Sequence, residues 1–145
     1  MTFLENTSGL EWLDLTDCKI TGTGLQHIHS NQDFVGLSLR LENTSLTDDD
    51  LAGLKNVNRL GAVSLVGTNV TGVGFQRLPS TLEIGSLDMS NTKLNEAGLR
   101  ELANREHLRA LIVDPTLVTT AKTIFAESHK STRISDVSPQ GEDFW

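Results

Sequence analysis

The sequence predicts an α/β fold built from a repeated unit, with parallel strands forming one sheet and short helices lining one side of it. One phrase occurs three times, as TGTGLQHI at 21–28, TGVGFQRL at 71–78 and NEAGLREL at 95–102, with a looser version, TDDDLAGL, at 47–54. The anchor residues Leu15, Leu39, Leu65 and Met89 recur at nearly even intervals, of which the middle one is slightly longer than the other two. The apolar positions around each anchor also recur.

The strands are expected where apolar residues follow an LxxLxL pattern, whose last two leucines share one face because side chains alternate along a strand. Four such sets are Leu10/Leu13/Leu15, Phe34/Leu37/Leu39, Leu60/Val63/Leu65 and Ile84/Leu87/Met89. A fifth strand, Leu108/Leu111/Val113, keeps the same spacing. The pattern therefore predicts five parallel strands.

A turn and a short helix are expected after each strand. The turn column is Cys18, Thr44, Thr68 and Thr92, and the helices carry apolar pairs three residues apart, Leu25/Ile28, Leu51/Leu54, Phe75/Leu78 and Leu99/Leu102. The expected N-caps are Thr21, Thr47, Thr71 and Asn95. Three carboxylates would meet the positive end of a helix dipole, those of Asp48, Asp49 and Asp50.

The chain departs from the pattern in three places. Two extra residues are expected between Leu39 and Thr44, as a bulge or a widened turn. In the last helix Thr123 and Ala126 replace the two leucines, and the columns are lost after Ile134. The repeat array is accordingly assigned to residues 1–137, with four full repeats, a partial N-terminal repeat and a degenerate C-terminal repeat or cap. Residues 138–145 form a C-terminal tail.

The overall pattern, LxxLxLxxTxLTxxGLxxL, resembles the leucine-rich repeat in its short form. It is similar to the ribonuclease-inhibitor-like and GALA types, as the segment NEAGLRELA at 95–103 shows. The resemblance implies a curved solenoid with the sheet on the concave side, helices on the convex side, and binding of other proteins as the usual role.

The composition excludes several classes. A net charge of −7 argues against a nucleic-acid partner and against an anionic membrane surface. No apolar run approaches the ~20 residues of a membrane span, and the first residues lack the pattern of a signal peptide. The one cysteine cannot form an internal disulfide. These features favour a cytoplasmic protein.

The motifs that could carry chemistry are better explained by structure. The GxG of TGTG and TGVG is interpreted as a helix start, because no Lys-Ser/Thr follows it. His27 and His29 are expected to face solvent without binding metal, and Cys18 is expected to be a buried structural thiol. No cofactor and no catalytic set are predicted. A hydrolase or transferase site assembled across repeats stays a remote alternative.

The positions that alternate with the buried strand residues are expected to face the concave side. They form three rows: Trp12, Gly36, Ala62, Ser86 and Ala110; Asp14, Ser38, Ser64, Asp88 and Ile112; Thr16, Arg40, Val66, Ser90 and Asp114. Most are small, so a partner could approach closely. Trp12 is interpreted either as a binding anchor or as a cover for the N-terminal edge. The carboxylates favour a basic partner segment, or serve only for solubility.

The expected function is non-catalytic protein–protein recognition by the concave sheet and its adjoining turns. The strands alone offer about 300 Å², less than the ~800 Å² per partner of a standard interface, so the turns must contribute. The alternative is a structural segment of a longer scaffold. Leu4 occupies the end-of-helix column of an incomplete preceding repeat, which suggests a fragment or an edge that self-associates.

Overall fold

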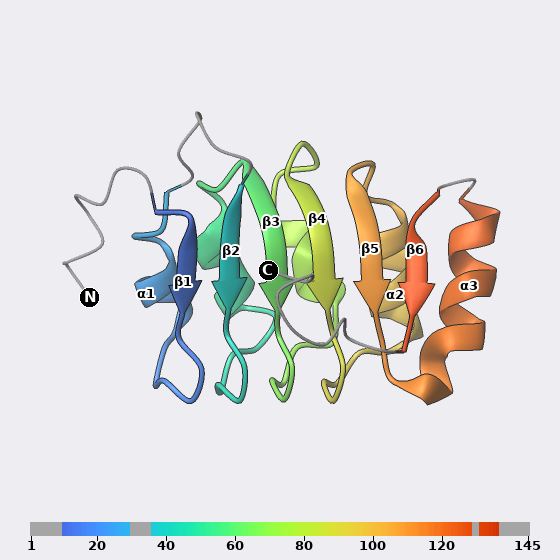
Figure 1. Cartoon of the computed structure of the whole chain (residues 1–145), viewed down its shortest axis with the longest axis horizontal. Coiled ribbons are helices and arrows are strands. Elements are labelled where there is room, and N and C mark those ends of the chain that lie inside the picture. The colour runs from blue at the N-terminus through green and yellow to red at the C-terminus, as the bar shows by residue number, and fades with distance from the viewer. Residues whose placement is uncertain (1–9, 30–35, 129–130, 137–145) are drawn as a thin grey trace.

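The computed structural model describes residues 10–29, 36–128 and 131–136 of the chain. It contains one parallel sheet whose six strands lie in chain order (Figure 1). The strands are β1 Trp12–Asp14, β2 Leu37–Arg40, β3 Arg59–Ser64, β4 Glu83–Asp88, β5 Leu108–Ile112 and β6 Arg133–Ser135. The α/β class and the parallel sheet are thereby confirmed.

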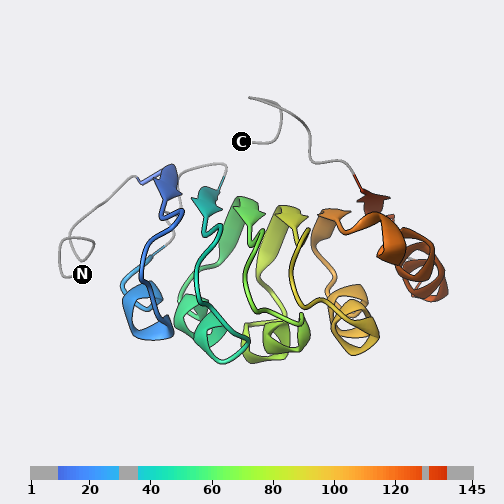
Figure 2. The ribbon, with the colours of Figure 1, turned by 90° about the horizontal axis from the view of Figure 1, so that it is seen from below.

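Short helices connect the strands. They are α1 Gly22–Leu25, η2 Asp50–Leu54, η3 Val73–Arg77, α2 Glu96–Ala103, η4 Pro115–Leu117 and α3 Val118–Glu127, of which the three labelled η are 3-10 helices. Figure 2 shows that the helices of successive units lie on the same side of the sheet. We call the opposite side of the sheet the helix-free face.

The core lies between the sheet and the helices. It contains the predicted apolar columns, including Leu25, Leu46, Leu65, Met89 and Leu99, each 0% exposed. A helix lies at the predicted place in all four repeats, although two of the helices adopt the tighter 3-10 form and α1 and η3 end before Ile28 and Leu78.

The predicted alignment of the second strand is wrong by two residues. Leu39 pairs with Leu13 rather than taking the place of Leu15. The backbone N–H of Leu41 donates to Ser64 O at 2.9 Å, as that of Leu65 donates to Asp88 O at 2.9 Å. Leu41 is thus the anchor, and the extra residues precede β2 instead of following it.

The error has a plain physical cause. The run LSLRL places a leucine at every second position, and Leu37, Leu39 and Leu41 are all buried. A strand with this pattern satisfies the core equally well after a shift of two residues. The register also changes between Leu37 and Leu39, where β2 pairs irregularly with β3. Phe34, the predicted start of this strand, lies outside the described residues.

The C-terminal unit is more complete than the pattern indicates. Helix α3 buries Ala121, Ile124 and Phe125, while the predicted positions Thr123 and Ala126 are exposed. The 3-10 helix η4, which begins at Pro115, directly precedes α3, so that other positions of α3 face the core than the repeat spacing predicts. Strand β6 follows, with Ile134 paired to Leu111. Its three residues include one large apolar side chain, too weak a signal for a strand.

The helix starts are joined across neighbouring units. Asn95 caps α2 as predicted, accepting from Gly98 N at 3.0 Å. The side chain of Asp48 reaches the next unit, where it accepts from Thr71 N at 3.0 Å and from Gly74 N at 2.7 Å. Asp50 reaches the preceding unit and accepts from Gly22 N at 2.7 Å. Carboxylates supply most of the capping at these starts, and of the predicted threonines Thr71 contributes one long contact, in which its Oγ1 accepts from Val73 N at 3.4 Å.

These contacts explain the GxG phrases. The N–H group of Gly74 is already bonded to a carboxylate of the chain itself, so it is not available to a phosphate. A Cβ built on Gly74 would lie 2.5 Å from Asp48 O, closer than side-chain atoms approach. The glycine thus allows two units to pack in contact, which supports the interpretation as a helix start.

Arg105 is a buried cation that the pattern does not predict. It is 5% exposed, and its guanidinium donates to Phe75 O at 2.9 Å and to Pro79 O. Burial lowers the pKa of Arg105, and the nearby Glu101 carboxylate acts in the opposite direction. The side chain ties the end of η3 to the segment that follows α2.

The turn column is confirmed only in part. The hydroxyls of Thr44 and Thr68 are buried and donate to the carbonyls of Leu41 at 2.8 Å and Leu65 at 2.7 Å. Cys18, predicted to be buried in the same column, is exposed. It belongs to the first described strand unit, and a thiol is a weak donor for the same carbonyl position.

Candidate binding face

The rows of the helix-free face follow from the strand register. Asp14 pairs with Arg40, Arg40 with Ser64, Ser64 with Asp88, and Asp88 with Ile112. Trp12 pairs with Ser38 in the next row. The residues of β2 therefore each move one row from their predicted places: Ser38 joins Trp12, and Arg40 joins Asp14. Gly36 precedes the strand.

Exposure divides this face into two regions. At the β1 edge Trp12 is 54% exposed and Asp14 is also exposed. In the middle lie four buried side chains, which we call the central patch: Ala62 at 3%, Ser64 at 1%, Asp88 at 2% and Ile112 at 2%. The other predicted site residues are half-buried: Thr16, Ser38, Arg40, Val66, Ser90 and Asp114.

The carboxylates of this face hold turns as well as carrying charge. Asp88 Oδ1 accepts from Ser90 N, and Asp114 Oδ1 accepts from Asn91 N, both at 2.9 Å. Asn91 has a φ of 52°, a left-handed conformation that asparagine tolerates better than most residues. These aspartates therefore have a structural role that would keep them in place without any partner.

Asp14 is partly neutralised. The Thr16 hydroxyl donates to its Oδ1 at 2.6 Å and, as the largest effect, lowers the pKa of Asp14. Burial opposes this shift, whereas the backbone of Thr16 and the guanidinium of Arg40 add to it. Arg40 lies 3.4 Å from Asp14 and 3.4 Å from Glu42. The β1 and β2 side of the face thus carries charges of both signs.

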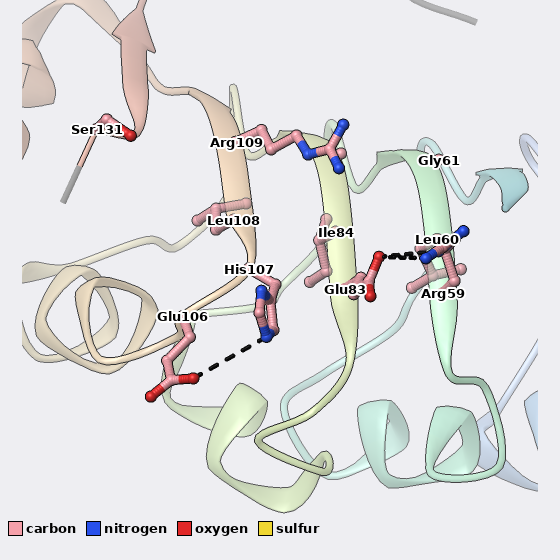
Figure 3. A pocket seen from close by; sticks show the side chains of 11 residues that line it. Arg59, Leu60, Gly61, Glu83, Ile84, Glu106, His107, Leu108, Arg109 and Ser131 are labelled. Carbon is pink, nitrogen blue, oxygen red and sulfur yellow. Dashed lines mark hydrogen bonds and ion pairs between the residues drawn. The ribbon is translucent and has the colours of Figure 1, made fainter. Parts of the chain in front are cut away.

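A pocket of about 560 Å³ lies where strands β3, β4 and β5 begin (Figure 3). Arg59 and Glu83 form one wall and are joined by an ion pair at 2.8 Å. His107 and Arg109 form the other wall, with Arg109 exposed. Sequence reasoning missed this pocket, although Gly61 and Gly85, at equivalent positions of consecutive repeats, lack side chains in two adjacent strands.

Charges of both signs lie at each end of the strands. The amino ends carry Arg59 and Arg109 together with Glu83 and Glu106. Asp88 and Asp114 lie at or just beyond the carboxyl ends, where Arg40 ends β2. Small residues, among them Ser38, Gly61, Ala62, Ser86 and Ala110, occupy the surface between these margins. Such a face suits a ligand that carries charges of both signs.

Other kinds of site were sought in the same part of the chain. Within the described ranges, no group of three or more His, Cys, Asp or Glu side chains is placed to hold a metal ion. His29 is exposed as predicted, and His27 is half-buried. None of the helices described here has the length and apolar character needed to cross a membrane.

Comparison of the chain with protein-family models, with curated proteins and with solved structures finds no match.

Proposed function

We propose that the protein is a leucine-rich-repeat array that recognises another protein through its helix-free face, without catalysing a reaction. The strand–turn–helix units, the sheet in chain order and the helices on one side support the repeat assignment. In such an array the sheet forms the concave surface, and neighbouring units stabilise one another. Its place in the cytoplasm stays a prediction.

The observation that carries this proposal is the floor of small residues between two charged margins. Ser38, Ser86 and Ala110 are partly exposed on three strands, so an extended backbone could approach the sheet closely. Trp12 offers a large exposed ring at one end of the same surface. Aromatic residues of this kind contribute strongly to protein interfaces.

The charges suggest the chemistry of the partner. A basic group of the partner would meet the carboxyl ends of the strands, where Asp114 lies half-buried. An acidic group would meet Arg109 at the pocket. Each such charge at the edge of an interface affects association rate and specificity more than affinity. The partner segment therefore carries both signs, whereas the sequence alone favoured a basic segment.

Affinity capture from the source cell tests the proposal. The chain is compared with Ser38→Arg/Ser86→Arg, which fills the small-residue floor, and with Gln26→Arg/Gln76→Arg on the helix side. Both variants add two positive charges, and all four positions are at least partly exposed. Thermal unfolding first verifies that all three proteins fold. We expect a protein that is retained by the unmodified chain and the control and lost with the floor variant.

Equal recovery of the same proteins by all three chains would contradict the proposal. Loss with the helix-side control alone would place the interaction on the other face. Because both variants have the same net charge, a general electrostatic effect cannot imitate the expected result.

A second function, self-association at the N-terminal edge, is favoured by one observation. Trp12 lies on β1, the first strand of the described sheet, and is its most exposed large apolar side chain. An edge strand presents unpaired backbone groups to another chain. Sedimentation velocity of the chain and of Trp12→Arg over a range of concentrations tests this function. A dimer that Trp12→Arg abolishes supports the scaffold; a monomer throughout contradicts it.

A further inference from the structure

The pocket at the start of β3, β4 and β5 contains charged groups that the fold does not pair. Arg59 donates from Nε and Nη2 to Glu83 Oε2, each at 2.8 Å, so these two side chains neutralise each other. Arg109 is exposed, and no carboxylate of the described residues lies within ion-pair distance of it. Glu106 is also exposed, and its contact with His107 is long, at 4.0 Å. One guanidinium and one carboxylate of the pocket are therefore open to a ligand.

The strand register determines how these charges are separated. Ile84 pairs with Leu108, so Arg109 lies one residue beyond this pair and Glu83 one residue before it. The two charged residues are thus two positions apart along the strands, about 7 Å at ~3.3 Å per residue. Glu106 lies one position further out than Glu83. The carboxylates therefore lie at the very start of the strands, and the open guanidinium lies further along them.

The surface beside Arg109 is bare backbone. Arg109 takes the place that Gly61 and Gly85 hold in the two preceding units. No side chain fits at Gly85, because its Cβ would collide with Gly61 O. Figure 3 shows the side chain of Arg109 extending from β5 toward β4, where this glycine lies. The guanidinium is thus presented to the pocket and not to a neighbouring side chain.

We propose that this pocket binds a short peptide of two or three residues with both ends free. Its carboxylate pairs with Arg109, and its ammonium group is held by Glu106 and Glu83. The planar guanidinium matches a carboxylate, to which it can donate two parallel hydrogen bonds. An extended peptide of this length spans roughly 7–10 Å, the separation that the register gives to the two charges.

The size and the charge of the pocket both favour this class of ligand. Its volume of about 560 Å³ lies within the range of roughly 300–1,000 Å³ that is typical of small-molecule sites. Glu83 and Glu106 repel an anion, and they repel a phosphate more strongly than a singly charged carboxylate because its charge is higher. A ligand that also brings a cation turns this repulsion into attraction. A zwitterion therefore fits better than a simple anion.

The inference does not depend on the proposed function. That function rests on the partly exposed floor of Ser38, Ser86 and Ala110, whereas the peptide site lies where the strands begin. A bound peptide would occupy Arg109, which the partner protein would otherwise meet. Capture of a partner tests the floor, and binding of a small peptide tests the pocket, so either proposal can fail without the other.

Nuclear magnetic resonance titration of the nitrogen-15-labelled full chain tests the inference. The probe is triglycine, and the readout is the backbone amide signals of Gly85 and Arg109. Three further probes separate the contributions: N-acetyl-triglycine lacks the ammonium group, triglycine amide lacks the carboxylate, and inorganic phosphate is an anion alone. The variant Arg109→Gln is compared with Lys122→Gln, which removes an exposed cation from α3 on the helix side.

We expect triglycine at millimolar concentration to shift both signals in a saturable way. Removing either charged end, or Arg109→Gln, should weaken binding at least about tenfold, because each removes a charge-assisted contact. Lys122→Gln should change it by less than about twofold, since a distant surface charge contributes little.

Three results would overturn the inference. The first is that triglycine leaves the signals of Gly85 and Arg109 unchanged. The second is that acetyl-triglycine or phosphate binds there as tightly as triglycine, which would make the pocket a general anion site. The third is an equal loss of binding in Arg109→Gln and Lys122→Gln, which would show an effect of net charge alone.

Discussion

The two faces of the sheet bury neighbouring residues for different reasons. Leu65 is 0% exposed and belongs to the core cluster, where apolar side chains from strands and helices surround it. Ser64, the preceding residue, is 1% exposed on the opposite face, and its hydroxyl is unpaired. Burial on the core side is thus a requirement of folding. On the helix-free face, Ser64 lies in register between Arg40 and Asp88 of the two neighbouring strands.

The largest effect is expected at the core. Leu65→Ala should lower the free energy of unfolding by about 2–5 kcal/mol, because it removes a fully buried side chain and leaves a cavity. Urea denaturation measures the change, with thermal unfolding as a second method. A loss below about 1 kcal/mol would mean that the site collapses around the smaller side chain, and the contrast between the faces would disappear.

The next effect concerns the carboxylate that joins η2 to η3. Asp48 accepts four hydrogen bonds, from Thr71 N, Thr71 Oγ1, Gly72 N and Gly74 N. Asp48→Ala leaves these donors without it and should cost about 2–4 kcal/mol. The matched control is Asp49→Ala, which removes an exposed carboxylate paired with Arg77 and should cost about 0–1 kcal/mol. Equal costs would contradict the capping role.

A pH effect on stability is expected for Asp50, the carboxylate that accepts from Gly22 N. Burial raises the pKa of Asp50, but hydrogen bonds from Gly22 and Thr47 outweigh it, so its pKa lies below the ordinary value. Because the folded pKa is the lower one, this carboxylate stabilises the fold above about pH 4, the unfolded value. The contribution is lost as the pH falls through the folded pKa.

Asp50→Asn should therefore cost about 1–2 kcal/mol near pH 7 and much less near pH 2. Denaturation of both proteins at several pH values measures the difference. A difference that stayed constant down to pH 2 would show that the charge of Asp50 does not contribute.

The smallest effect is expected on the helix-free face. Ser64→Ala removes a hydroxyl that has no partner, so stability should change by no more than about 1 kcal/mol, in the direction of stabilisation. Denaturation alongside Leu65→Ala gives the sharpest comparison, since the two residues are adjacent. A clear loss of stability, beyond the error of the measurement, would show that Ser64 is hydrogen-bonded in solution.

Much of the fold follows from the apolar columns. The strands, the helix pairs and the alternation of the two faces depend on spacings within each unit and on the interval between units, which the sequence displays directly. The register of β2 does not, because Leu39 and Leu41 fit the same column. The sequence also does not predict that Asp48 and Asp50 cap helices of neighbouring units, because the same residues would fit the start of their own helix equally well.

The candidate site was predictable in outline only. Alternation identifies which residues face away from the helices, and Trp12 was correctly singled out as exposed. It does not reveal that Asp88 and Ile112 are buried. The pocket beside Arg59 and Arg109 depends on three strands beginning at one level, a property of register rather than of composition.

Site-specific photo-cross-linking in living source cells tests the central claim most directly. A photoreactive benzoylphenylalanine replaces Ser86 on the helix-free face in one chain and Gln76 on the helix side in another. The account predicts a covalent adduct with a second, different protein from position 86 and none from position 76. Adducts from position 76 alone, or from neither position, would contradict recognition by the helix-free face.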